Sequence, residues 1–175
     1  MDEKRGIGKD NKIPWHIKED LVRLKNLTIG RVTIIGRKTY ESMDYYYKKS
    51  GREMPGKLYI VVTRDKNYKT NRDNATTVQA IEDAIELANS EEQEEVIIMG
   101  GGQIFKEALE KDLVDRLYLT IVEARLDSPP ESPARRGDFD ADTFFPDYSK
   151  FGKTVSEEEH DNGEYKFKFL TLEKP

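Results

Sequence analysis

The chain contains no cysteine, and its 175 residues include only two histidines, His16 and His160. The absence of cysteine excludes a disulfide framework and a cysteine-ligated metal site. Two histidines cannot form a histidine-rich metal centre, and carboxylates alone would hold magnesium only weakly. The sequence therefore predicts no metal cofactor.

Long apolar runs are also lacking. No run approaches the roughly 18 residues that a membrane-spanning helix needs, and the charged start at 1–5 lacks the apolar core of a signal peptide. Charged residues make up 36% of the chain, with a formal net charge of −5, which disfavours a general nucleic-acid binder. We therefore expect a cytoplasmic protein that has neither a membrane nor a nucleic acid as partner.

One acid lies among apolar residues at helical spacing near the start of the chain. A helix is predicted over 17–27, with an apolar stripe formed by Ile17, Leu21, Leu24 and Leu27. Asp20 lies on that stripe. Burying a carboxylate is costly and raises its pKa, so such an acid is a candidate for proton chemistry or for binding a cationic ligand. The alternative is an ordinary helix-start acid that stabilises the helix dipole and bends back to water.

Short apolar runs alternate with helical patterns along the chain. Strands are predicted over residues 31–35, 58–63, 96–99, 116–122, 151–156 and 165–172. Helices are predicted over 17–27, in a short piece after Arg37, and over 80–88 and 103–109. Asp161-Asn162-Gly163 is a strong hairpin turn between the last two strands. This order predicts a single α/β domain over 1–175, with a mixed, mostly parallel sheet flanked by helices and a C-terminal antiparallel hairpin.

Two further stretches are predicted to be loop insertions. Residues 44–53 contain three consecutive tyrosines, and residues 127–138 contain Pro129, Pro130 and Pro133. The prolines favour an extended conformation for the second stretch. Neither stretch marks a domain boundary, because the segments on each side are too small to fold alone.

Two strand-to-helix turns carry glycine where a phosphate could approach the backbone. The first is Gly36 followed by Arg37 and Lys38, and the second is the glycine triplet at 100–102. Glycine allows this close approach, and the helix that follows offers free N–H groups. Two cations at a helix start are unfavourable beside the positive end of the dipole, and a bound anion would remove that conflict. The alternative is a pair of solvated surface cations.

Two such turns in one small α/β domain fit a dinucleotide better than a single phosphate. Their spacing matches neither the Rossmann fingerprint nor the P-loop. Arg64, just beyond a predicted strand, could join Arg37 and Lys38 around an additional phosphate. This arrangement favours NADP over NAD, because arginine binds phosphate through a planar fork.

In the order in which they occur, these residues resemble dihydrofolate reductase of the chromosomal bacterial type. The resemblance covers nearly the whole chain. It is carried by the segments GIGKDNKIPW (6–15), EDL (19–21), KNLT (25–28), IGRKTYES (35–42), MPGK (54–57), MGGGQIF (99–105), LYLT (117–120) and DTFFP (142–146).

The resemblance implies NADPH-dependent reduction of 7,8-dihydrofolate, with hydride transfer to C6 and a proton reaching N5. It makes Asp20 the single active-site acid, bonded to the pterin amino group and ring N3. Thr120 would support that carboxylate, and Trp15 would hold a nearby water. A buried acid of this kind fits the proton chemistry expected from the residues themselves.

The resemblance also implies which residues bind the ligands. The substrate-binding residues would be Ile13, Leu21, Leu24, Lys25, Met43, Lys57 and Met99. The cofactor-binding residues would be Ile7, Gly8, Asn11, Gly36, Arg37, Lys38, Thr39, Thr63, Arg64, Gln79, Gly100, Gly101, Gly102, Gln103, Ile104 and Phe105. Residues 7–13 resemble the mobile loop that closes over nicotinamide, and we call them the lid.

The chain departs from the family pattern in several places. The family has an apolar central strand before the Gly-Ile-Gly loop, whereas Met1 stands almost directly at that loop. A trimmed start, a rearranged sheet and a strand from a partner chain are competing explanations. Lys57 replaces the usual arginine that grips the substrate carboxylate, and lysine offers a point charge instead of a fork. Phe105 replaces a tyrosine, and Gln79 brings no charge to the adenine region.

These departures leave alternatives open. We expect weakened activity and poor binding of diaminopyrimidine antifolates, because carbonyl acceptors of the first strand are missing. We expect a monomer, with a strand-supplying dimer as the alternative. A nucleotide-binding protein with lost or weak turnover and a related pyrimidine-type reductase are the competing functions.

Overall fold

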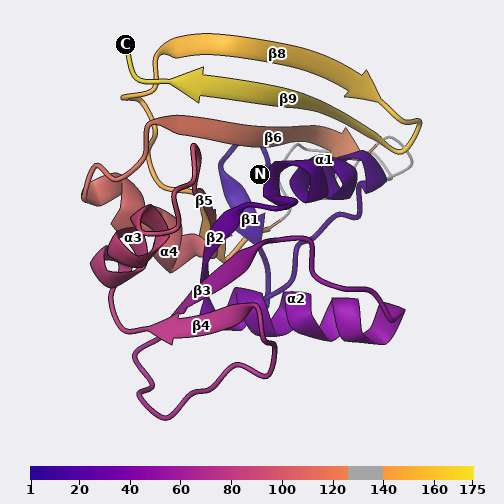
Figure 1. Cartoon of the computed structure of the whole chain (residues 1–175). Helices are drawn as coiled ribbons and strands as arrows, with labels where there is room; N and C mark the ends of the chain where they lie inside the picture. Colours follow the sequence, from indigo (N-terminus) through magenta and orange to yellow (C-terminus); the bar gives the residue numbers. More distant parts are fainter. Residues whose placement is uncertain (126–139) are drawn as a thin grey trace. The chain divides into compact units, whose positions relative to one another are not determined.

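The computed structural model describes residues 1–125 and 140–175 (Figure 1). The chain divides into two compact units: the terminal unit, Met1–Asp20 with Leu109–Pro175, and the central unit, Leu21–Ala108. The sheets and apolar clusters of one unit are separate from those of the other. The insertion predicted at 127–138 lies outside the described residues, and the single domain over 1–175 stays a prediction.

The central unit is built on a parallel sheet with the strand order β4-β3-β2-β5. The apolar runs of the sequence form these strands, as predicted, and the short β4 was not expected. The predicted α/β class is confirmed. The strands are β2 (Val32–Gly36), β3 (Leu58–Val62), β4 (Ala75–Val78) and β5 (Ile97–Gly100). The helices of the described residues are α1 (Lys18–Thr28), α2 (Arg37–Ser50), α3 (Ile81–Asn89) and α4 (Gly102–Glu110).

Successive residues of the central strands point to opposite faces of the sheet. Val32 and Ile34 of β2 are fully buried in a cluster that includes Ala84 of α3. Ile35 of β2 is fully buried in a second cluster that includes Tyr40 of α2. Helices on both faces explain why these strands read as continuous apolar runs instead of alternating ones.

The prediction of a loop at 44–53 is wrong for residues 44–50, which belong to α2. Asp44 is nearly buried and pairs with Lys48, one turn later in the helix, at 2.7 Å, and with Arg72. Burial opposes ionisation of Asp44, but hydrogen bonds from Lys48 and Arg72 outweigh it and lower the pKa of this carboxyl. Gly51 ends the helix with a φ of 66°, a left-handed conformation that suits glycine. A long-range partner, Arg72, therefore helps to extend the helix where local sequence suggested a loop.

The terminal unit contains an antiparallel sheet with the order β6-β9-β8, visible as three long adjacent strands in Figure 1. The predicted hairpin is confirmed: Gly163 has a φ of 85°, and the Asn162 side chain accepts from the Tyr165 N–H at 2.8 Å. A second, two-stranded sheet pairs β1 with β7. The bounds are β1 (Gly6–Gly8), β6 (Arg116–Arg125), β7 (Thr143–Phe144), β8 (Lys153–Asp161) and β9 (Tyr165–Glu173).

Residues at the start of the chain pair with β6. Asp2 forms a parallel bridge with Val122, and the Val122 N–H donates to the Met1 carbonyl at 2.8 Å. The Met1 amino group donates to the Thr120 carbonyl at 2.6 Å. In the described part of the chain, β5 and β6 are edge strands of separate sheets.

Candidate active site

Asp20 lies in the first turn of α1, and its carboxylate contacts a strand hydroxyl. The Thr120 hydroxyl of β6 donates to Asp20 Oδ1 at 2.7 Å. Both residues are half-buried. A hydrogen bond from a fixed strand orients the carboxylate and leaves its other acceptor positions for a ligand.

Trp15 lies in the core of the terminal unit. It is 9% exposed and belongs to a cluster with Ile17, Val122 and Phe167. The Met1 amino group lies close to Thr120, because it donates to the Thr120 carbonyl. Burial lowers the pKa of the Met1 amino group to about 6, although the nearby Asp20 carboxylate acts in the opposite direction. The negative charge of Asp20 therefore acts on the buried amino group of Met1.

The apolar stripe predicted on α1 does not face a core along its whole length. Ile17, just before the helix, is 1% exposed, but Leu21 is 44% and Leu24 37% exposed. The expectation that the stripe is core-facing is therefore wrong for these two leucines. Helical spacing records which residues share a face of the helix but not what covers that face.

The lid at 7–13 forms a tight hairpin of its own. Lys9 and Lys12 exchange backbone hydrogen bonds at 2.9 Å in both directions. Between them, Asp10 and Asn11 have φ values of 50° and 58°. Two consecutive left-handed residues are the pattern of a tight hairpin turn, for which Asp and Asn are among the favoured residues. Ile13, the last residue of the lid, is 63% exposed.

Asp142, to which the sequence assigned no role, makes two hydrogen bonds with the lid from the position just before β7. Its Oδ2 accepts from the Asp10 N–H at 2.8 Å, and its own N–H donates to the Gly8 carbonyl at 3.0 Å. The Asp10 N–H and then the Thr143 hydroxyl hold the pKa of Asp142 below its usual value. The only sequence signal was an acid at the start of the DTFFP segment.

Replacing Asp142 by Ala is expected to lower turnover several-fold while changing the unfolding free energy little. The variant loses the acceptor for the Asp10 N–H, so the lid is held less firmly in this position. Steady-state kinetics and thermal unfolding of the two proteins measure the two effects. Asp140→Ala is the matched control, because Asp140 contacts the lid through an exposed ion pair with Lys9 at 2.9 Å. Equal kinetic losses in both variants would contradict the assignment.

The first glycine turn lies between β2 and α2. Gly36 precedes α2, no side chain caps the start of the helix, and its first turn contains no acid. The first helical residues are instead Arg37 and Lys38. A methyl group added at Gly36 would lie 3.0 Å from the Ile104 side chain, so only glycine fits easily. This helix start offers N–H groups and positive charge to an anion.

The second glycine turn lies between β5 and α4. Gly100 has a φ of 100°, and the first turn of α4 contains no acid. A methyl group added at Gly101 would lie 2.9 Å from the Thr39 hydroxyl, and one at Gly100 would lie 2.6 Å from the Phe105 ring. The two turns are therefore close together in the central unit. Their glycine backbone and the basic residues of the first turn fit the phosphate groups of a dinucleotide.

Several predicted binding residues have partners within the central unit. Arg37 pairs with Asp65 at 3.3 Å, and Lys57 pairs with Glu91 at 3.0 Å. Met43 and Met99 pack against the apolar cluster of Tyr40. The acids Asp65 and Glu91 were missed, because neither lies near its partner in sequence.

The remaining predicted residues fall into two groups. Ile7, Gly8 and Asn11 lie in the terminal unit, in the lid. Thr63 is buried at the end of β3, and the exposed Gln79 follows β4. The central unit also holds Lys25, Lys38, Thr39, Arg64, Gly102, Gln103 and Ile104.

Within the described ranges, no group of histidine and acidic side chains is arranged to hold a metal ion. In the same ranges, no helix is long and apolar enough to cross a membrane. The terminal unit holds one oriented carboxylate, and the central unit holds two glycine turns suited to phosphates. These features define an α/β enzyme of the nucleotide-cofactor-binding class.

Comparison with known proteins narrows this class. A family profile described as dihydrofolate reductase matches residues 1–174. The chain is 35% identical to dihydrofolate reductase type 3 of Salmonella typhimurium, over 95% of this chain and 89% of that protein. It is 38% identical to a Staphylococcus haemolyticus dihydrofolate reductase over 83% and 72%, and 32% identical to one of Bacillus subtilis (strain 168) over 99% and 90%.

The chain belongs to the dihydrofolate reductase family. It is an oxidoreductase that reduces dihydrofolate to tetrahydrofolate, with NADPH as the cofactor of the family. The resemblance stated from the sequence is thus confirmed, together with the cofactor and the type of enzyme.

Proposed function

We propose that Asp20 binds the pterin ring of 7,8-dihydrofolate through the ring amino group and N3. The observation that carries this proposal is the hydrogen bond from the Thr120 hydroxyl to Asp20 Oδ1. It fixes the carboxylate in one orientation and leaves the second oxygen able to accept from two adjacent N–H groups. Thr120 is then a positioning residue, and Asp20 the residue that touches the substrate.

The charge of Asp20 favours the protonated form of the pterin. When bound, NADPH supplies the hydride that reaches C6. The proton for N5 comes from a water that Trp15 orients, and the apolar cluster around Trp15 limits the access of bulk water. The chain itself therefore provides orientation, a single negative charge and a route for one proton.

We propose that the two glycine turns hold the cofactor. Residues 36–39 with Thr63 and Arg64 bind the adenosine end, and Gln79 lies toward the adenine. Residues 100–105 bind the pyrophosphate and nicotinamide region, and Ile7, Gly8 and Asn11 of the lid cover the nicotinamide. The glycine backbone and the helix starts without acids support this assignment.

We propose that this protein binds the substrate tail more weakly than a protein with the arginine usual in the family at position 57. The exposed Leu21 and Leu24 offer apolar surface to the benzoyl group, and Met43 of the same unit contributes a further apolar side chain. Ile13, Lys25 and Met99 complete the proposed set. Lys57 is engaged with Glu91 at 3.0 Å, so gripping the substrate carboxylate requires Lys57 to leave that pair. We further propose that residues 1–175 act as one domain of a cytoplasmic monomer.

The test is the dihydrofolate-dependent loss of NADPH absorbance at 340 nm with purified protein. NADPH binding is measured separately by fluorescence. We expect NADPH to bind and the absorbance to fall only when dihydrofolate is present. NADPH binding without turnover would overturn the proposed mechanism in favour of a binding protein. Turnover of another heterocycle in place of dihydrofolate would favour the pyrimidine-type reductase.

A further inference from the structure

Arg37, which the sequence predicts to bind the additional phosphate of the cofactor, forms an ion pair with Asp65. Arg37, the first residue of α2, donates from Nη1 to Asp65 Oδ2 at 3.3 Å. The guanidinium lies 5.6 Å from the centre of the Tyr68 ring, and its Nε is 3.9 Å from Glu41 Oε1. Of the two acids, Asp65 is therefore the one at hydrogen-bonding distance.

Asp65 is held in this position by its own turn. Its N–H donates to the Thr63 hydroxyl at 3.2 Å, and its Oδ1 accepts from the Asn67 N–H at 3.0 Å. One carboxylate oxygen thus closes the turn after β3 while the other faces Arg37. The position of the negative charge is set by the backbone and does not depend on the ion pair alone.

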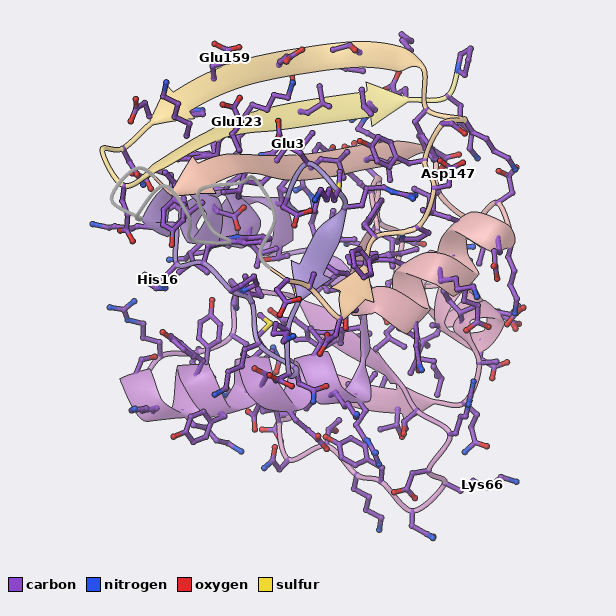
Figure 2. All side chains as sticks on the ribbon, turned by 180° about the vertical axis from the view of Figure 1, so that it is seen from behind. Glu3, His16, Lys66, Glu123, Asp147 and Glu159 are labelled. Carbon is purple, nitrogen blue, oxygen red and sulfur yellow. The ribbon has the colours of Figure 1, made fainter. Side chains whose placement is uncertain are left out.

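The residues next to this pair in the chain are positively charged. Lys38 follows Arg37 in α2, and Arg64 and Lys66 flank Asp65 in the chain. Figure 2 shows Lys66 extending outward from the loop that carries Asp65. A phosphate group at Arg37 would therefore meet the negative charge of Asp65 at hydrogen-bonding distance from the guanidinium, and that of Glu41 farther away.

We propose that Asp65 is a specificity-determining residue that weakens the binding of the 2′-phosphate of NADPH and so narrows the preference for NADPH over NADH. The phosphate carries close to two negative charges at neutral pH and must share or displace the Asp65–Arg37 pair. An NADH ribose instead presents an uncharged 2′-hydroxyl, which can be accommodated while the Asp65–Arg37 pair stays intact. This inference rests on the proposed cofactor site.

Asp65→Asn is the variant that tests the proposal. Asparagine keeps a side-chain oxygen for the Asn67 N–H, so the turn is retained, but it removes the charge that faces Arg37. Titration calorimetry with 2′,5′-ADP and with 5′-ADP measures binding directly, without turnover. We expect 2′,5′-ADP to bind about three- to tenfold more tightly in the variant, because the pair is partly exposed and screened, and 5′-ADP to bind unchanged.

The same change is expected in the kinetics, as a rise in the ratio of kcat/KM for NADPH to that for NADH. Glu41→Gln is the matched control: it removes one negative charge next to the same guanidinium at a longer distance, and a smaller effect is expected. In an Arg37→Met background, the effect of Asp65→Asn should shrink, because the two residues act through one contact.

Equal gains from Asp65→Asn and Glu41→Gln, or an unchanged affinity for 2′,5′-ADP, would overturn the inference while leaving the cofactor site intact. Failure of either nucleotide to bind the wild-type protein would instead overturn the proposed site, and the inference with it.

Discussion

Asp20→Asn is expected to reduce the turnover of dihydrofolate at neutral pH by about 10²- to 10⁴-fold, the range for a residue that supports proton transfer. Asparagine has nearly the same shape and still offers an oxygen to the Thr120 hydroxyl, which lies 2.7 Å from the Asp20 carboxylate. What is lost is the negative charge that favours the protonated pterin. Because lower pH protonates the substrate without that help, the activity of the variant should partly recover as the pH falls.

Glu19→Gln is the matched control for this variant. Glu19 lies in the same first turn of α1 and is exposed, and its carboxylate accepts from the Asn162 side chain at 3.2 Å. If Asp20 only stabilised the helix dipole, the two variants would lose similar, small amounts of stability, about 0.3–1 kcal/mol each, and neither would lose turnover specifically. That result, from steady-state kinetics and urea unfolding measured side by side, would refute the catalytic role of Asp20.

Gly100→Ala is expected to be the most damaging single methyl addition in the second glycine turn. Gly100 has a φ of 100°, and the added methyl group would lie 2.6 Å from the Phe105 ring. The backbone strain and the overlap together should cost about 3 kcal/mol or more of unfolding free energy. NADPH binding should weaken as well, because the turn proposed to hold the pyrophosphate must move.

Gly51→Ala separates the two contributions to this loss. Gly51 also has a left-handed backbone, with a φ of 66°, but a methyl group there meets no atom within 4 Å. Its loss should be about 1–2 kcal/mol, the cost of the left-handed conformation. A Gly100→Ala variant in a Phe105→Leu background should recover part of the difference. Urea unfolding provides the free energies, and equal losses at Gly51 and Gly100 would show that the Phe105 contact is unimportant.

Local patterns in the sequence predicted much of the fold. The strands at 32–36, 58–62 and 97–100 form where continuous apolar runs end at glycine or at a turn. The hairpin at 161–163 depends only on the residues within it. The glycine turns were also predictable, because a strand, a glycine and a helix start that follow one another must form a backbone cradle.

Elements that depend on distant residues were not predictable in the same way. The short strands β1 and β7 contain five residues between them and exist because they pair with each other across 135 or more positions of the sequence. The second half of α2 was assigned to a loop because its many charged and tyrosine side chains have no clear period. Arg72 supplies the partner that Asp44 needs to be nearly buried there.

By itself, the sequence determined the α/β class, the position of the acid Asp20 and the two glycine turns, because each depends on residues close together in the chain. Only the tertiary structure decided three other pairings of side chains: Asp142 with the lid, Glu91 with Lys57 and Asp65 with Arg37. These contacts join residues far apart in sequence, where periodicity carries no information, and they depend on how the strands and turns are brought together by burial of the apolar runs.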